Sequence, residues 1–240
     1  MTKRNRRPIP IQIIGTQRSG SNLLRLIMNQ SQDISAHHPP HILTVFSPIL
    51  HKYGDLTQIA NFERLTNDVC RLIKVNPVKW GIPFDQKEII DRCSQPTLVE
   101  IFKVVYEMMA AEDQATYWCC KSMANVKFFN ELEHNGMKPH YIHLIRDGRD
   151  VATSFKKTLV GEKHAYHLAN IWKENIIKAK EVFNTVSEKR CLTIRYETLI
   201  SNPEQVLENL NTFLGIHLGS SSLNYFNSKE SKKTAAAGFM

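Results

Sequence analysis

The chain carries the stretch Gly15-Thr16-Gln17-Arg18-Ser19-Gly20-Ser21-Asn22 between an apolar run and a helical pattern. Residues 9–14 before it are almost all apolar, which predicts a buried strand, and residues 23–28 after it are typical of a helix. A glycine loop between a strand and a helix offers backbone N–H groups and the positive end of the helix dipole to an anion. The stretch therefore predicts an α/β domain with an anion-binding loop after its first strand.

This loop lacks the residues that hold ATP in nucleoside triphosphatases. Their loop reads G-x-x-x-x-G-K-[ST], with Lys on the phosphates and Ser or Thr on magnesium. Gly15 and Gly20 keep that spacing, but Ser21 stands at the Lys position and Asn22 at the Ser/Thr position. Arg18 can supply a cation instead, since a planar guanidinium suits a bidentate grip on phosphate or sulfate oxygens. We expect an anion held without the Lys and Mg²⁺ pair.

A second anion-binding turn is predicted at Arg146. The apolar residues 141–145 precede it and predict a strand, and ligands bind at the carboxyl ends of strands in open α/β sheets. Asp147 can cap the following helix, with Asp150 in its first turn. Ser154 lies about two helical turns further on, where its hydroxyl can reach the same phosphate. The other interpretation is a surface cluster of caps and ion pairs.

Together the two turns resemble those of the sulfotransferases that use 3′-phosphoadenosine 5′-phosphosulfate (PAPS). The 5′-phosphosulfate loop of that family reads roughly G-x-x-[RK]-[ST]-G-[ST], and residues 15–21 fit it. Its 3′-phosphate segment reads R-[DN]-x-x-D, with a Ser eight residues after the first Arg, which is the spacing of Arg146 and Ser154. The resemblance covers residues 9–41, 117–155 and 190–215 in order. It implies that residues 15–22 hold the 5′ side of PAPS and that Arg146 and Ser154 hold its 3′-phosphate.

Two further positions are carried over from the resemblance. Residues 195–199 read R-Y-E-T-L, like the family's R-Y-E-x-L segment, where the Tyr lies near the adenine. Tyr196 is the candidate for that contact, and the alternative is a core tyrosine at a strand end. Lys121 ends another predicted strand, where several sulfotransferases carry a Lys that contacts the transferred sulfuryl group. Such a Lys stabilises charge on the sulfate and on the leaving phosphate.

The general base is sought in the segment His37-His38-Pro39-Pro40-His41. Sulfuryl transfer to a hydroxyl needs a group that removes the acceptor proton, and imidazole titrates near neutral pH. Tyrosylprotein-type sulfotransferases place a Glu after the first helix, and the matching position here is His38 or Pro39. We predict His38 as the base, with His41 as the second candidate. Three His also suggest zinc, but no fourth ligand is evident, so no metal is expected.

The C-terminal segment is predicted in two ways. Residues 231–240 look like the start of a late loop with which many cytosolic family members close the 3′-phosphate site, and the sequence stops there. Lys232 and Lys233 are candidate phosphate contacts on that view. On the other view residues 228–240 form a flexible or truncated end.

Strand and helix patterns alternate along the chain, which predicts an α/β, P-loop-type, three-layer fold with a mostly parallel central sheet and helices on both faces. Strands are expected at residues 9–15, 117–121, 141–145 and 191–196. Helices are expected at residues 20–31, 97–111, 126–135, 150–157, 164–186 and 202–215. Residues 35–96 mix loop and helix signals and predict an insertion on the substrate side. The whole chain, 1–240, is expected to form one domain.

The composition of the chain limits the kinds of ligand and location that it suits. The 240 residues carry a net charge of +8, which favours anionic ligands, yet no recognised nucleic-acid-binding module is present. Residues 1–8 form a basic tail with no signal peptide after it, and no window reaches transmembrane length. The five cysteines form no CxxC pair. They indicate reduced thiols in a cytoplasmic protein.

The predicted function is transfer of a sulfuryl group from PAPS to a hydroxyl or amine of an acceptor. A sugar, a small molecule, a lipid or a peptide tyrosine all remain open as acceptor, as does the oligomeric state. The first alternative is a P-loop kinase of small molecules, against which Ser21 stands at the Lys position. The second alternative is a non-catalytic nucleotide-binding protein.

Overall fold

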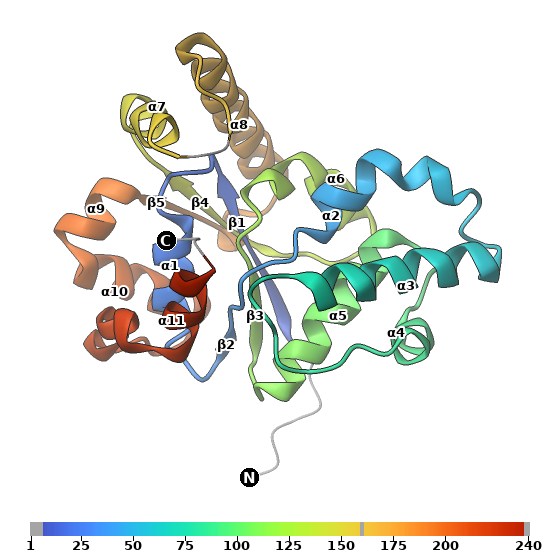
Figure 1. Ribbon diagram of the computed structural model, residues 1–240. Helices are drawn as coiled ribbons and strands as arrows, with labels where there is room; N and C mark the ends of the chain where they lie inside the picture. Colours follow the sequence, from blue (N-terminus) through green and yellow to red (C-terminus); the bar gives the residue numbers. More distant parts are fainter. Residues whose placement is uncertain (1–6, 159–160, 238–240) are drawn as a thin grey trace.

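Five parallel strands form one sheet at the centre of the protein, in the order β2-β3-β1-β4-β5 (Figure 1). The structure is a computed structural model that describes residues 7–158 and 161–237. The strands are β1 Ile9–Gly15, β2 Ile34–Ser35, β3 Tyr117–Cys120, β4 His140–Ile145 and β5 Cys191–Arg195. The four predicted strands are confirmed. We did not predict β2, because two residues carry no periodic signal.

Helices cover both faces of the sheet, as expected for parallel strands that are joined by crossovers. Side chains alternate along each strand, so Ile11 and Ile13 of β1 pack on one face, whereas Trp118 and Cys120 of β3 pack on the other. The first face carries α1 Ser21–Met28, α9 Tyr196–Ser201 and α10 Pro203–Leu214, followed by the 3₁₀ helix η4 Ser220–Asn227. The predicted three-layer α/β fold is confirmed.

Residues 35–96 build a helical layer on the second face. It contains α2 Ile42–Phe46, the 3₁₀ helix η1 Ser47–Tyr53, α3 Ile59–Val75 and α4 Gln86–Arg92. These elements share one hydrophobic cluster with α5 Leu98–Glu112 and β3. Trp80 seals the layer, since its ring lies 5.0 Å from that of Tyr106 and 5.8 Å from that of Phe84 between centroids. The insertion is thus continuous with the core, and its contact with an acceptor stays a prediction.

Two helix predictions were wrong in detail. The helix expected at 126–135 is a 3₁₀ helix, η2 Met123–Phe128, followed by α6 Phe129–His134. It starts early because the backbone turns directly after β3, where the Ser122 carbonyl accepts from the Asn125 N–H at 2.8 Å. The first helix ends at Met28 rather than at residue 31. The Asn29 side chain accepts from the Ala36 N–H at 2.9 Å, and this contact links the end of the helix to the segment after β2.

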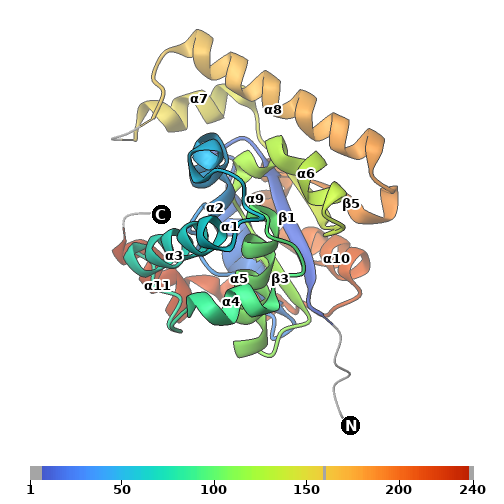
Figure 2. The same cartoon turned by 90° about the vertical axis from the view of Figure 1, so that its right-hand side faces the viewer.

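The helices α7 Gly148–Lys156 and α8 Ala165–Thr185 lie beyond the carboxyl end of β4 and run across one end of the sheet (Figures 1 and 2). A 3₁₀ turn, η3 Glu188–Arg190, leads from α8 to β5. Within residues 7–158 and 161–237, no helix is long and apolar enough to cross a membrane.

The C-terminal segment folds into a packed helix. Residues Lys229–Ala236 form α11, which buries Glu230, Ser231 and Thr234. The end expected to be flexible from residue 228 is therefore a helix over Lys229–Ala236, because three of its polar side chains are buried. Lys232 and Lys233 lie on its exposed side. Residues 238–240, like residues 1–6 of the basic tail, lie outside the described part of the chain.

Candidate functional site

The loop after β1 is a tight turn that needs glycine at two positions. Gly15 has a φ of 136°, and a Cβ there would lie 2.4 Å from the Leu144 carbonyl oxygen. Gly20 has a φ of 88°, and a Cβ there would lie 2.3 Å from the ring of Tyr196. Both contacts are too short for real atoms, and both backbone conformations are in the region that favours glycine. The two glycines therefore bring the loop backbone against β4 and α9.

Two hydroxyls inside this loop fit an anionic ligand. Thr16 and Ser19 are only 3% and 1% exposed. Within the described residues, neither Oγ1 of Thr16 nor Oγ of Ser19 has a hydrogen-bond partner. Buried polar atoms without a partner are costly, so these two hydroxyls are available to hydrogen-bond a ligand. No side chain caps the N-terminus of α1, which leaves its first N–H groups open to the same ligand.

The structure brings the two sequence motifs together at the carboxyl edge of the sheet. Nε of Arg18 donates to Oγ of Ser154 at 3.1 Å, although 136 residues separate them. Nη1 of Arg146 donates to the carbonyl of Arg18 at 3.0 Å. Arg18 itself has a φ of 69°, which is uncommon for a residue other than glycine. The loop and the β4–α7 turn thus form one cationic site rather than two separate ones.

Tyr196 contacts residues of both motifs. The guanidinium carbon of Arg146 lies 4.2 Å from the centroid of the Tyr196 ring, close enough for a cation–π interaction. The same ring packs under Gly20. Tyr196 therefore supports both the loop and Arg146, and its contact with adenine stays a prediction.

Sequence reasoning missed two residues that hold the β4–α7 turn. Nε1 of Trp172 donates to the Arg146 carbonyl at 3.0 Å, and its ring packs against Gly148. Glu197 accepts from the Asp147 N–H at 2.9 Å. Glu197 stood in the R-Y-E-T-L segment, so its signal was available, whereas Trp172 on α8 had none. The predicted helix cap is confirmed, because Asp147 accepts from the N–H of Arg149 at the start of α7.

Lys121 follows β3 directly. Burial, and after it the positive charges of Arg25 and Arg18, lower its pKa to about 8. The two arginines thus disfavour a further positive charge on Lys121. An anion bound beside Lys121 would offset this repulsion, so the charge pattern fits a negatively charged ligand.

His38 and His41 lie on the same side as Lys121, with ring centroids 6.1 Å apart. Burial and then the charge of Lys121 lower the pKa of His38 to about 2 and that of His41 to about 4. Both imidazoles are therefore neutral at neutral pH, and a pKa this low also makes them weak proton acceptors in the protein without ligand. Ser122 Oγ lies 2.9 Å from Nδ1 of His41 and orients that ring. His41 also has a φ of 60°, a strained backbone conformation of the kind found at functional sites.

The remaining predicted loop residues differ in their surroundings. Gln17 is exposed at the tip of the loop, and Ser21 is the first residue of α1. Oδ1 of Asn22 accepts from Nη2 of Arg25 at 2.9 Å and from Nε at 3.1 Å. Asn22 thus faces the buried side of α1 with this oxygen rather than the loop. Lys232 and Lys233 are exposed on α11.

Neither a metal cluster nor a reactive thiol is found in the described part of the chain. Its residues include no group of three or more His, Cys, Asp or Glu that could hold a metal ion. All five cysteines, which lie within it, are free thiols. Burial raises the pKa of both Cys119 and Cys120 in β3, which makes them poor nucleophiles.

Comparison with known families decides the identity of the chain. The model of the sulfotransferase family matches residues 10–219, which include the loop, the β4–α7 turn and Lys121. The chain belongs to the sulfotransferase family. It is accordingly a sulfotransferase enzyme, and the family resemblance predicted from its motifs is confirmed. No curated protein sequence matches this sulfotransferase.

Solved structures share the fold of this sulfotransferase at low sequence identity. The sulfotransferase domain of the Synechococcus PCC 7002 olefin synthase is 20% identical, with a TM-score of 0.63 over 96% of this chain and 82% of that one. The sulfotransferase domain of the curacin biosynthetic pathway is 19% identical, with a TM-score of 0.67 over 97% and 83%. The sulfotransferase STF9 from Mycobacterium avium is 10% identical, with a TM-score of 0.53 over 96% and 69%.

Proposed function

We propose that this sulfotransferase moves a sulfuryl group from PAPS to a hydroxyl or amine of its acceptor. The observation that carries the proposal is the junction of Arg18, Ser154 and Arg146, which joins two anion-binding turns into one site. A nucleotide with phosphate on both its 3′ and its 5′ side needs two such turns, whereas ATP needs one. The absence of a Lys at the position of Ser21 also disfavours a kinase.

The residues of the site fit PAPS as donor substrate. The backbone of residues 15–22 and the buried hydroxyls of Thr16 and Ser19 would bind its 5′-phosphosulfate. Arg146 and Ser154 would bind its 3′-phosphate, and Tyr196 would lie near its adenine. Lys232 and Lys233 are the proposed additional phosphate contacts on α11. No metal takes part in this scheme.

In the proposed reaction His38 accepts the proton of the acceptor hydroxyl, and the acceptor oxygen attacks the sulfur in line. Arg18, Lys121 and the loop N–H groups stabilise negative charge on the sulfuryl oxygens and on the phosphate that leaves. Burial and Lys121 hold the pKa of His38 at about 2 without ligand. Phosphate and sulfate charges next to Lys121 would offset that cation, which is the second cause after burial, and would thereby raise the pKa of His38.

His41 is the second candidate for the base. Ser122 fixes Nδ1 of its ring, which directs Nε2 away from that contact. Its pKa of about 4 is lowered less than that of His38. The layer formed by residues 35–96 carries both histidines and is the proposed acceptor side, open to a sugar, a small molecule, a lipid or a peptide tyrosine. Five free thiols agree with a cytoplasmic location.

A transfer assay tests this function. PAPS with a radiolabelled sulfuryl group is incubated with the protein and a panel of the four acceptor classes, with and without a chelator. We expect labelled acceptor in at least one class and equal rates with the chelator. Transfer of phosphate from ATP in the same panel, with no transfer from PAPS, would contradict the proposal.

A further inference from the structure

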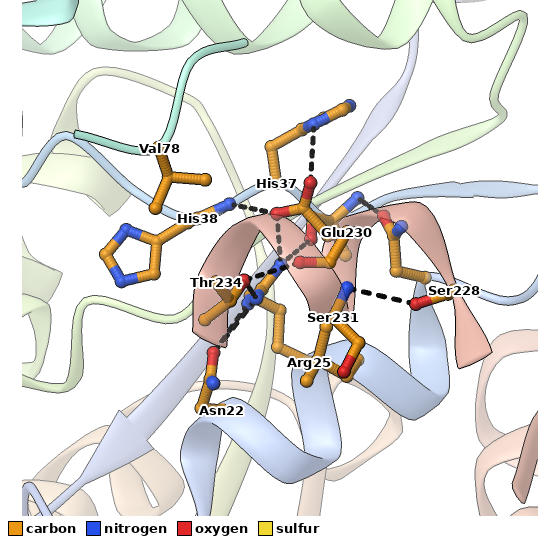
Figure 3. A network of polar contacts seen from close by, with 12 residues as sticks. Asn22, Arg25, His37, His38, Val78, Ser228, Glu230, Ser231 and Thr234 are labelled. Atoms are coloured by element: carbon orange, nitrogen blue, oxygen red, sulfur yellow. Dashed lines mark hydrogen bonds and ion pairs between the residues drawn. The ribbon is translucent and has the colours of Figure 1, made fainter. Parts of the chain in front are cut away.

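A buried ion pair ties the first helix to the last one. Arg25 of α1 is 0% exposed and Glu230 of α11 is 6% exposed, and Nη1 of Arg25 lies 2.8 Å from Oε1 of Glu230 (Figure 3). Nη2 of Arg25 also donates to Oγ1 of Thr234 at 2.9 Å and to Asn22. The pair thus connects residues 205 positions apart in the chain.

Stability alone does not account for this pair. Removing two charges from water costs about as much as their attraction returns, so well-packed apolar side chains would stabilise the same contact equally well. What apolar side chains cannot do is direct hydrogen bonds to a particular backbone atom.

Both charges hold the segment that carries His38. Nη1 of Arg25 donates to the Ala36 carbonyl at 2.8 Å, and Oε1 of Glu230 accepts from the His38 N–H at 3.2 Å (Figure 3). Asn29 accepts from the Ala36 N–H at 2.9 Å, and Nε1 of Trp80 donates to the His38 carbonyl at 2.7 Å. Four side chains, two from α1 and its C-cap, one from the loop at Trp80 and one from α11, thus satisfy both backbone groups of Ala36 and both of His38.

This arrangement replaces secondary structure. Residues 36–41 form neither helix nor strand, and Pro39 and Pro40 have no N–H with which to form one. Without the side-chain contacts, the backbone that sets the direction of the His38 ring would have no fixed conformation. A misplacement of about 1 Å at a reacting group can lower a rate a hundred-fold.

We propose that Glu230 is a positioning residue for sulfuryl transfer: its carboxylate fixes the backbone of His38 relative to the phosphate-loop helix through Arg25. The inference rests on the proposed function, in which His38 is the base. Glu230 touches neither reacting atom in this account. The helix α11 therefore belongs to the working site, although its sequence showed only two exposed lysines as candidates.

Four variants distinguish a residue that positions His38 from a brace, that is, a residue that only stabilises the fold. Glu230→Ala removes the acceptor, and Glu230→Asp keeps the charge but withdraws it by one methylene. Glu230→Gln keeps an oxygen that can accept from both Arg25 and His38, although it removes the counter-charge. Thr234→Val is the matched control, because it removes the buried hydrogen bonds of the Thr234 hydroxyl to Arg25 and to the Glu230 carbonyl but no contact to the His38 backbone.

Glu230→Ala and Glu230→Asp should lower kcat by roughly ten- to a hundred-fold while the affinity for adenosine 3′,5′-bisphosphate stays within about threefold. Glu230→Gln and Thr234→Val should keep kcat within about threefold of the wild-type value, even where they lower the melting temperature. The order of kcat across the variants then differs from the order of stability. If kcat instead follows stability, or if the folded Ala and Asp variants are fully active, Glu230 is only a brace and the inference is wrong.

Amide hydrogen exchange at residues 36–38 gives a readout without turnover. Exchange of the His38 N–H should be faster in Glu230→Asp than in the wild type and unchanged in Thr234→Val. Should Glu230→Ala fail to fold, Glu230→Asp decides both measurements. A wild-type protein that transfers no sulfuryl group contradicts the proposed function, and exchange at His38 still shows whether Glu230 holds that segment. Unchanged exchange in Glu230→Asp overturns the inference.

Discussion

The phosphate loop and the histidine segment meet at Arg25 but are built in opposite ways. The loop has a local sequence signal, Gly15 and Gly20 between a strand and a helix. Residues 36–41 have no regular structure, and contacts from α1, Trp80 and α11 hold the backbone of Ala36 and His38. The proposed nucleotide site can thus be predicted from a short motif, whereas the position of the proposed general base depends on contacts between distant segments.

The largest expected effect is on turnover in the histidine segment. His38→Ala should lower kcat by roughly a hundred-fold or more, because it removes the proton acceptor, while nucleotide affinity stays almost unchanged. Labelled-sulfate transfer and nucleotide binding are measured on the same preparation. His41→Ala is the matched variant, and loss of activity there alone would move the role to His41. Loss of nucleotide binding in either variant would mean that the two regions are not separable.

The second-largest expected effect is on nucleotide binding, at the proposed 3′-phosphate contact. Arg146→Ala should weaken binding of adenosine 3′,5′-bisphosphate by about ten- to a hundred-fold and hardly change binding of AMP, since a charge-assisted contact of about 1.5–3 kcal/mol is lost. Arg149→Ala is the control, because Arg149 lies on the same turn but pairs with Asp147 at the surface. Equal weakening of both nucleotides by Arg146→Ala would make that residue structural.

A third variant tests how closely the loop is packed. Gly20→Ala should lower nucleotide affinity about tenfold, because the new Cβ would push Tyr196 and the loop apart at a cost of about 1–3 kcal/mol. Gly81→Ala is its control, since Gly81 has a similar φ of 91° but a Cβ added there would meet no atom within 4 Å. Calorimetric binding and melting curves compare the two. Equal affinities in the two variants would show that the Tyr196 contact is not needed.

The smallest effect is on stability against pH. His41 has a pKa lowered to about 4 in the folded protein and near 6.5 when unfolded, so the unfolded chain binds more protons between these values. The contribution of neutral His41 to the free energy of unfolding is complete above pH 6.5 and is lost as the pH falls towards 4. His41→Gln should flatten the dependence of the melting temperature on pH in that window. A slope equal to that of the wild type would contradict the buried, neutral state of His41.

Sequence reasoning succeeded where local chemistry decides. The strands, the loop glycines and the Asp147 cap follow from apolar runs and turn residues that act within a few positions. It failed where distant segments decide. Nothing near Trp172 or Glu230 in the sequence signals that one holds the Arg146 carbonyl and the other the His38 amide. Likewise, β2 is a strand only because β3 lies beside it.

Calorimetric titration without added metal tests the central claim most directly, that two motifs form one site for a 3′-phosphorylated nucleotide. Adenosine 3′,5′-bisphosphate, AMP and ATP are titrated into the same wild-type protein. We expect adenosine 3′,5′-bisphosphate to bind at least about tenfold more tightly than AMP, because Arg146 and Ser154 would contact its second phosphate. We also expect weaker binding of ATP than of the bisphosphate. Equal affinity for ATP and adenosine 3′,5′-bisphosphate would contradict the central claim.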